Sequence, residues 1–262
     1  MDESVELMNI ARGTAGASGA NLKNLLNEAA LSAARKGRSC VTAVETLEAR
    51  DKVRYGKERR SLEIDDKEKE TTAYHESGHA VIGMVVEHGE HIEKVTIIPR
   101  GFSLGATHFL PKKNRLSYWR KELIDQLAIL LGGRVAEEIF VGDISSGASN
   151  DIERLTALAR SMVCDWGMTD KLGAVMYGES DGDSQSMGVG PQQSKNYSES
   201  TAQTIDSEVR RLIDEAHLRA VEIINEKKAE VELMTRMLIE FESLDDVDVK
   251  EIMDGTWTLE NK

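Results

Sequence analysis

The sequence reads His-Glu-Ser-Gly-His at residues 75–79, which is an H-E-x-x-H motif. The motif lies in a segment from 65 to about 87 whose capping-box start and apolar continuation predict one long helix. Side chains four positions apart project from the same face of a helix, so both imidazoles can reach a single ion. Because neutral imidazole is a good zinc ligand, His75 and His79 are candidate zinc ligands.

The glutamate of the motif points in a different direction from the two histidines. Helix geometry places Glu76 about 100° around the axis from His75, close to the open position of the ion. From there a carboxylate takes a proton from water and passes it to a leaving amine. Glu76 is therefore the candidate general base.

A third metal ligand must come from elsewhere, because catalytic zinc ions usually have three protein ligands. Asp151 is favoured because it shares a predicted helix face with Leu155 and Leu158, so its carboxylate borders the buried side. A carboxylate in the first turn of a helix is also explained simply by the helix dipole. The other acidic candidates are Glu137, Glu138 and Asp143.

The remaining histidines and one cysteine are candidates by residue type alone. His88 and His91 lie beyond the useful turns of the motif helix, and we expect them to face solvent. His108 alternates within a predicted strand, where an exposed position is the simpler explanation. His217 lies in a distant charged helix without another ligand signature, and Cys164 has no partner cysteine nearby.

The rest of the sequence predicts a mainly α-helical protein with a small β-hairpin. The strands of the hairpin are predicted at Val95–Ile98 and Ala106–Leu110. Further helices are predicted at 117–140, from 151 to 162 or 163, and along the periodic segment 205–241. Gly132 and Gly133 fit the first of these only if another element packs closely against them. Residues 179–200 predict a mobile surface loop.

The N-terminal part predicts a separate small helical unit. Ser18 is the expected N-cap of a helix ending near Gly37, and Thr42 with Glu45 predicts a capping box for the next helix. The apolar residues expected on one face of the first helix are Leu22, Leu25, Leu26, Ala29 and Ala33.

The distribution of charge supports a boundary near residue 60. Residues 1–60 carry 11 Lys/Arg against 8 Asp/Glu, whereas the remainder carries 22 against 38. Because this change coincides with a charged stretch, we expect two units, 1–60 and 61–262.

Composition also excludes several classes of protein. A net charge of −13 argues against a nucleic-acid partner, and two cysteines are too few for a disulfide scaffold or a cysteine-rich zinc site. The longest apolar stretch, Ala80–Val86, is far shorter than the ~20 residues of a membrane-spanning helix. We also expect no signal peptide in these residues.

Several stretches together resemble the proteolytic portion of the FtsH family, the membrane-anchored AAA+ zinc metalloproteases. The resemblance covers nearly the whole chain, with Asn21 where the family usually has Asp and Ser77 where Ala is more common. The stretches that carry it are TAYHESGHA at 72–80, IIPRG at 97–101, LLGGRVAEE at 130–138, SGASNDIER at 146–154 and, in the first unit, GASGANL at 16–22.

The resemblance implies roles that the spacing alone leaves open. It implies that Asp151 is the third zinc ligand beside His75 and His79, and that Glu76 is the general base. It implies that 1–60 is the helical lid remnant of an AAA+ ATPase module and that the peptidase domain assembles as a homo-hexameric ring. ATP and the membrane are expected only for a complete protein, since no phosphate-binding G-x-x-x-x-G-K-[ST] motif occurs here.

These features predict a zinc-dependent endopeptidase that hydrolyses unfolded or membrane proteins as the proteolytic part of an ATP-dependent protease. The resemblance places the peptidase domain, a soluble fragment of the anchored protein, on the cytoplasmic or equivalent side of the membrane. An extended substrate is expected to pair with an edge of the hairpin near Val95–Ile98. The alternatives are an inactive scaffold or chaperone-like ring subunit, which the intact motif disfavours, and a self-standing soluble peptidase, which the lid-like first unit disfavours.

Overall fold

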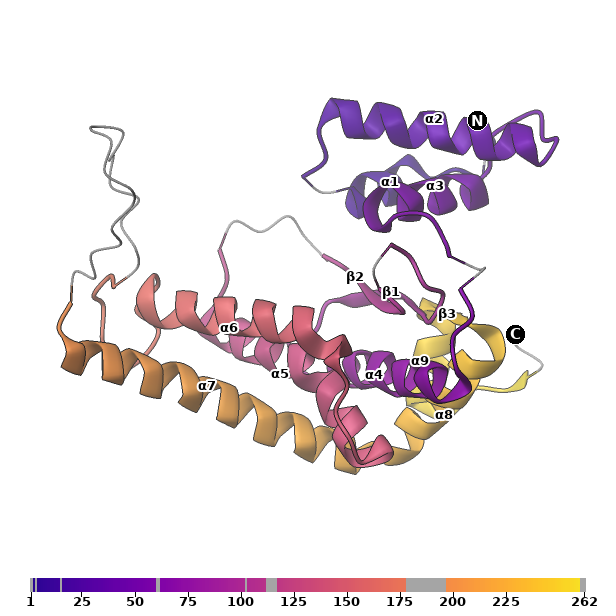
Figure 1. Ribbon diagram of the computed structural model, residues 1–262. Helices are drawn as coiled ribbons and strands as arrows, with labels where there is room; N and C mark the ends of the chain where they lie inside the picture. Colours follow the sequence, from indigo (N-terminus) through magenta and orange to yellow (C-terminus); the bar gives the residue numbers. More distant parts are fainter. Residues whose placement is uncertain are drawn as a thin grey trace.

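The structure is a computed structural model that describes residues 2, 4–14, 16–59, 62–101, 103–111, 117–177 and 197–259 (Figure 1). The elements are α1 (Leu7–Gly13), α2 (Gly19–Arg35), α3 (Ala43–Tyr55), α4 (Asp66–Val85), β1 (His91–Thr96), β2 (Ala106–Leu110), α5 (Arg120–Ala136), the π-helix η1 (Glu137–Val141), the 3-10 helix η2 (Ser146–Ala148), α6 (Ser149–Cys164), α7 (Glu199–Glu226), α8 (Lys228–Phe241), β3 (Ser243–Asp245) and α9 (Asp246–Asp254). The predicted class, mainly helical with a little β-structure, is confirmed.

The first three helices form a module at one end of the molecule, which we call the lid module (Figure 1). The Ser18 side chain accepts a hydrogen bond from the Asn21 amide and so caps α2. Thr42 and Glu45 form the capping box predicted for α3. Local sequence signals therefore set where both helices begin.

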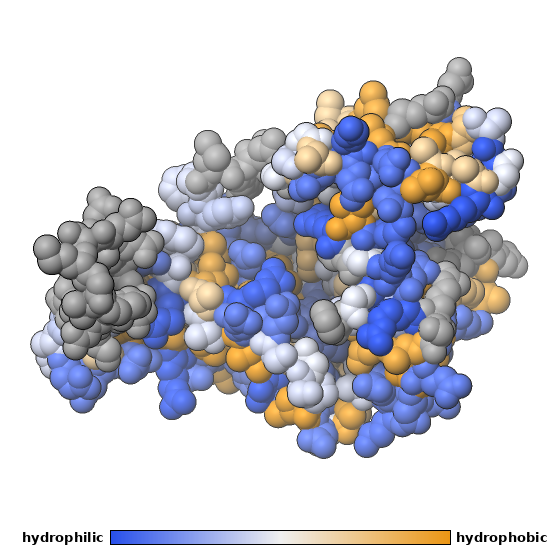
Figure 2. Space-filling view, turned by 45° about the horizontal axis from the view of Figure 1, so that its top comes forward, coloured by the Kyte–Doolittle hydropathy of each residue, from blue (hydrophilic) through white to orange (hydrophobic). Residues whose placement is uncertain are grey.

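The lid module buries only part of its apolar surface. Leu22 and Leu26, predicted to share the face of Leu25, are 38% and 44% exposed, whereas Leu25 is buried. Figure 2 shows apolar residues on the surface of this module among polar ones. A unit of three short helices has too little interior to cover every apolar side chain. Its other exposed large apolar residues are Leu7, Met8, Leu31, Val44 and Leu47.

The motif helix α4 lies inside the second unit, packed against α5, α8 and β1. The helix begins after Asp65 as predicted, but the Asp65 side chain makes no capping hydrogen bond. It ends at Val85 rather than near 87. A Cβ atom built on Gly78 would lie 2.2 Å from the carbonyl oxygen of Gly132. Gly78 and Gly132 therefore let α4 and α5 cross at backbone contact, which explains the first glycine of the pair inside α5.

The sheet contains one strand that the sequence analysis missed. Its order is β2-β1-β3, with Val95 paired antiparallel to Thr107 on one side and to Leu244 on the other. β1 is therefore central, and the prediction that the stretch Val95–Ile98 offers a free edge to a substrate is wrong. Within the described residues, no strand pairs with the outer edge of β2.

The long C-terminal helical segment is broken once. The periodic stretch 205–241 forms α7 and α8, which meet at Lys227, where the backbone leaves helical geometry (φ −106°, ψ 28°). The break lets α8 turn onto α4, where Thr235 donates a hydrogen bond to Ser77. Both Met234 and Met237 are buried, as expected for core residues.

The predicted domain boundary and the predicted surface loop fall wholly or partly outside the described residues. Residues 60 and 61 lie outside the described residues, so the boundary near 60 stays a prediction. Most of the loop predicted at 179–200 also lies outside them, but Ser198 caps α7 and residues 199 and 200 are helical. In the part of the chain that is described, no helix combines the length and the apolar character needed to cross a membrane.

The lid module contacts the sheet through charged residues. Arg50 of α3 is buried between Glu93 of β1, at 2.6 Å, and its neighbour Asp51, at 3.2 Å. Lys94 of β1 lies 3.7 Å from Asp51. We call Arg50, Asp51, Glu93 and Lys94 the lid–sheet charge cluster. His108 of β2 lies near it and is only 5% exposed, so the prediction of an exposed strand position is wrong.

Candidate metal centre

The motif helix places its two histidines as the spacing predicts. Both imidazoles project from one face of α4, are buried, and approach each other with Nε2 atoms 3.0 Å apart. The packing of α5 is matched to them, because a Cβ atom on Gly133 would lie 2.5 Å from the His75 ring. Gly133 therefore leaves the space that the first histidine occupies.

Asp151 joins the two histidines from the first turn of α6. Its Oδ2 lies 3.2 Å from His75 Nε2 and 3.4 Å from His79 Nε2. These three residues are the group of candidate metal donors found among the described residues. A tetrahedral zinc ion with bonds of about 2.0–2.1 Å needs ligand atoms roughly 3.3 Å apart. The spacing and the chemistry of this donor set fit zinc.

The second ring nitrogen of each histidine is also fixed. His79 Nδ1 lies 2.7 Å from the carbonyl oxygen of Ile129, and His75 Nδ1 lies 2.7 Å from Glu137 Oε1. Because a carbonyl and a carboxylate accept hydrogen bonds, both Nδ1 atoms donate. Nε2 of each ring is then the atom available to a metal, as is usual when a ligand's other nitrogen is held by an oxygen.

Glu137 thus contacts a candidate ligand without joining the donor group. It is 1% exposed in the π-helix that follows α5, and its carboxylate accepts hydrogen bonds from the amide and hydroxyl of Ser145. Glu137 was one of the acidic candidates for the third ligand, and its contact with His75 Nδ1 was not predicted. The acidic pair at the end of LLGGRVAEE was the available signal, but it does not say which atom each carboxylate reaches.

The other candidates lie outside the donor group. Glu138 pairs with Arg134 and with His217. Asp143 is exposed and accepts a hydrogen bond from the next amide, while Cys164 is buried at the end of α6.

The two histidines that follow the motif helix differ from each other. His91 is half-exposed, as expected. His88 faces solvent only in part, because its side chain is 27% exposed and its Nδ1 lies 2.8 Å from the buried carboxylate of Asp125. That carboxylate also pairs with Arg219, so the contact ties three segments of the fold together.

The electrostatics of the site favour a cation. Burial alone would lower the pKa of His75, but hydrogen bonds to Asp151 and Glu137 raise it to about 10. Burial would raise the pKa of Asp151, and its contacts with the two imidazoles lower it instead. The two carboxylates around the imidazoles therefore favour a positive charge at this position, which suits a metal cation.

Glu76 lies beside the donors and is not one of them. Its side chain is buried, and Oε2 accepts a hydrogen bond of 2.8 Å from the Thr107 hydroxyl on β2. The structure therefore keeps the candidate base next to the candidate ligand His75 while leaving it outside the donor group.

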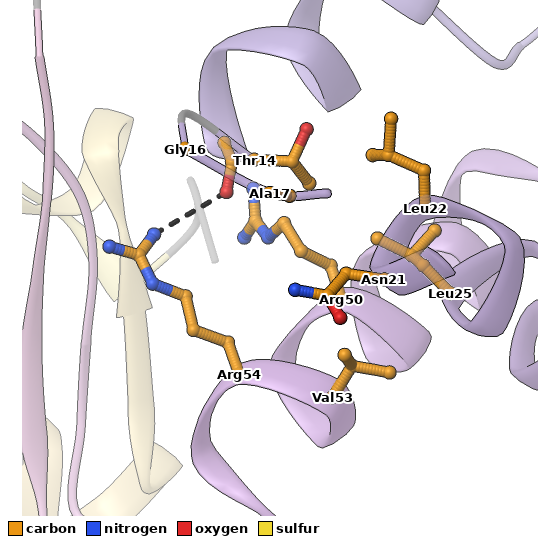
Figure 3. Close-up of a pocket in the computed structure, with 10 residues that line it drawn as sticks. Thr14, Gly16, Ala17, Asn21, Leu22, Leu25, Arg50, Val53 and Arg54 are labelled. Carbon is orange, nitrogen blue, oxygen red and sulfur yellow. Dashed lines mark hydrogen bonds between the residues drawn. The ribbon is translucent and has the colours of Figure 1, made fainter. Parts of the chain in front are cut away.

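A pocket of about 240 Å³ lies elsewhere, within the lid module (Figure 3). Residues of α1, α2 and α3 line it, and Arg54 on its wall donates a hydrogen bond to the carbonyl of Gly13. Arg50 also lines it, but its guanidinium already pairs with two carboxylates. None of the metal donors borders this pocket, so it is separate from the candidate metal centre.

A mainly helical domain in which a carboxylate from a second helix meets the two histidines of an H-E-x-x-H helix is characteristic of the metallopeptidases. Comparison with known families agrees: residues 62–252 match peptidase family M41, and residues 4–48 match the AAA+ lid domain. The chain belongs to peptidase family M41.

Named relatives support this assignment. The ATP-dependent zinc metalloprotease FtsH of Chlamydia trachomatis serovar L2 is 63% identical over 262 residues, covering 100% of this chain and 29% of that protein. The protein of the same name from Protochlamydia amoebophila is 67% identical over 253 residues, covering 97% and 28%. The Haemophilus influenzae protein is 43% identical over 253 residues, covering 96% and 40%. The chain thus spans less than half the length of these relatives, and the resemblance to the FtsH family is confirmed.

Proposed function

We propose that this chain is a zinc-dependent endopeptidase and the proteolytic part of an ATP-dependent protease. The observation that carries the proposal is the convergence of two imidazoles and one carboxylate, with contacts of 3.0 to 3.4 Å, beside a buried glutamate that is not a donor. The names of the relatives support the same activity.

In this proposal His75, His79 and Asp151 are the protein ligands of one zinc ion. Zinc bound there would supply Lewis-acid chemistry, by polarising a carbonyl and lowering the pKa of a water molecule. Glu137 holds the His75 ring through Nδ1, and the Ile129 carbonyl holds the ring of His79. These contacts fix the orientation of the ligands and raise their basicity.

Glu76 is proposed as the general base and acid. Its carboxylate accepts a proton from the attacking water and then donates it to the amine that leaves when the peptide bond breaks. A residue with this duty must stay close to the reacting atoms without being tied up as a ligand, and Glu76 meets both conditions by its place between the ligand His75 and strand β2.

The substrate is proposed to be an extended, unfolded polypeptide that adds to the outer edge of β2. Backbone hydrogen bonds to a strand edge bind many sequences, which suits an enzyme with varied protein substrates. The position of Thr107 supports β2 in this role, because the strand passes beside Glu76. This assignment replaces the one for β1, whose two edges are both paired.

The remaining parts of the proposal concern a complete protein. There the lid module would belong to an AAA+ ATPase that uses ATP to deliver unfolded or membrane proteins to the peptidase. The chains would form a homo-hexameric ring, with the peptidase domains on the cytoplasmic or equivalent side of the membrane. The match to the AAA+ lid domain and the ATP dependence in the names of the relatives support the ATPase part of this context.

The test compares Glu76→Gln with the unchanged chain on a short unstructured fluorogenic peptide, which needs no ATP-driven unfolding. We expect Glu76→Gln to keep its zinc, measured by elemental analysis, and to lose about 100-fold or more in kcat. The matched control is Glu70→Gln, an exposed position on the same helix, which should cleave normally. Full activity in Glu76→Gln would exclude the general-base role, and a wild-type chain that neither holds zinc nor cleaves would refute the proposed function.

A further inference from the structure

Thr107 contacts the candidate general base Glu76 and lies outside the H-E-x-x-H motif. Thr107 Oγ1 lies 2.8 Å from Glu76 Oε2 and 3.1 Å from the Glu76 carbonyl oxygen. A hydroxyl has one proton to donate, and an ionised carboxylate at the shorter distance is the stronger acceptor. The hydroxyl therefore donates to the carboxylate in this arrangement.

The start of β2 is also shaped around the same carboxylate. A Cβ atom on Gly105 would lie 2.9 Å from Glu76 Cγ and 3.0 Å from Oε1, closer than packed atoms normally approach. The glycine therefore makes room for the side chain, while the threonine two positions further on holds one of its oxygens. Gly105 directly precedes β2 and Thr107 is the second residue of that strand, so both contacts come from the same short stretch of chain.

The sheet fixes the threonine in turn. Thr107 pairs with Val95 in the central strand β1, and Val95 also pairs with Leu244 in β3. Val95 and Leu244 are completely buried. A hydroxyl on such a framework has little freedom to move away from its acceptor, whereas a glutamate side chain by itself has several rotamers of similar energy.

We propose that Thr107 is a positioning residue for the general base, holding the Glu76 carboxylate so that one oxygen is occupied and the other exchanges protons. This inference rests on the proposed function of Glu76. The hydrogen bond selects the Glu76 rotamer needed in the reaction before substrate binds. This preorganisation lowers the barrier of the chemical step. No motif signal marks Thr107, because its role follows from the packing of β2 against α4.

The test measures kcat and KM of Thr107→Val and Thr107→Ser on the same peptide. We expect Thr107→Val to lower kcat by about 10- to 100-fold while KM changes little, because the β2 backbone is unaltered. Thr107→Ser retains the hydroxyl and should restore most of the lost kcat. Zinc content should match wild type in both variants, since Thr107 touches no metal donor.

Thr96→Val is the matched control for a purely structural effect. Thr96 is a buried threonine of the same sheet whose hydroxyl donates to the carbonyl of Glu242, away from Glu76. It should lose thermal stability without losing kcat. A normal kcat in folded, zinc-loaded Thr107→Val, or a kcat in Thr107→Ser as low as in Thr107→Val, would overturn the inference.

A double-mutant cycle separates this inference from the proposed function. If the contact exists, the unfolding midpoints of Thr107→Val, Glu76→Ala and the double variant should be non-additive, because alanine has no oxygen to accept the Thr107 hydroxyl. Additive midpoints would overturn the positioning role whatever the activity. If Glu76→Gln cleaves normally, the general base is wrongly assigned, and the positioning role of Thr107 falls with it.

Discussion

Two buried polar clusters lie on opposite faces of strand β2, and they differ in how their charge is balanced. On one face Thr107 leads to Glu76 and the candidate metal centre. On the other, His108 lies close to the lid–sheet charge cluster of Arg50, Asp51, Glu93 and Lys94. Neighbouring residues of a strand face opposite ways, so a single strand separates the two clusters.

The lid–sheet charge cluster balances its own charge, because two basic side chains meet two acidic ones. The candidate metal centre contains two carboxylates, of Asp151 and Glu137, against two imidazoles, and within the described residues no Lys or Arg forms an ion pair with either carboxylate. Buried ionised carboxylates need a compensating cation. The lid–sheet charge cluster is therefore neutral without any further ion, whereas the candidate metal centre is arranged to bind a cation.

The largest effect that separates the two clusters is expected from Asp151→Asn. This substitution keeps the size of the side chain and removes the charge that the donor set needs. We expect zinc affinity to fall by about 100-fold or more, measured by competition with a chelator, and peptide cleavage to fall to background.

The matched control for that change is Asp143→Asn, at an exposed acidic residue that sequence analysis also weighed as a ligand. It should bind zinc and cleave as the unchanged chain does. Normal zinc affinity in Asp151→Asn would show that the ion is held by another set of donors.

The lid–sheet charge cluster should respond to Arg50→Met with lost stability and unchanged zinc content. The substitution leaves Asp51 and Glu93 without their main partner, and breaking a buried ion pair costs about 3 kcal/mol or more. Urea unfolding would measure the change. Lys52→Met, which breaks the more exposed pair with Glu28, should cost much less, because exposed ion pairs contribute little to stability. Equal costs for the two variants would contradict the comparison.

A smaller effect is expected from pH. Burial lowers the pKa of His108 to about 4, below its ordinary value of 6.5. Between these values the unfolded chain binds a proton that the folded chain does not, so stability falls as pH drops from 6.5 toward 4. The contribution of this one group is about 3 kcal/mol.

His108→Gln should flatten the dependence of the urea midpoint on pH across that interval. His91→Gln, at a half-exposed histidine on the neighbouring strand, should leave the dependence as it is. If both variants gave the same curve as the unchanged chain, His108 would not be the buried neutral group described above.

The parts of the fold that could be predicted are those encoded by neighbours in the sequence. The caps at Ser18 and Thr42, the motif helix and strand β2 all follow from residue types within a few positions of one another. The strand β3 was missed because three residues carry no periodic signal, and the break at Lys227 because the apolar period continues through it.

In the candidate site, the residues on α4 could be predicted from the sequence alone, because helix geometry is local and the spacing of His75, Glu76 and His79 sets their directions. Only the tertiary structure decided which carboxylate meets them. Asp151 lies 76 positions from His75, and Glu137 lies 62 positions away, yet one reaches Nε2 and the other Nδ1. These contacts depend on how α4, α5 and α6 cross, and the close crossing of α4 and α5 depends on Gly78 and Gly132. No local sequence pattern encodes a crossing between helices that are distant in the chain.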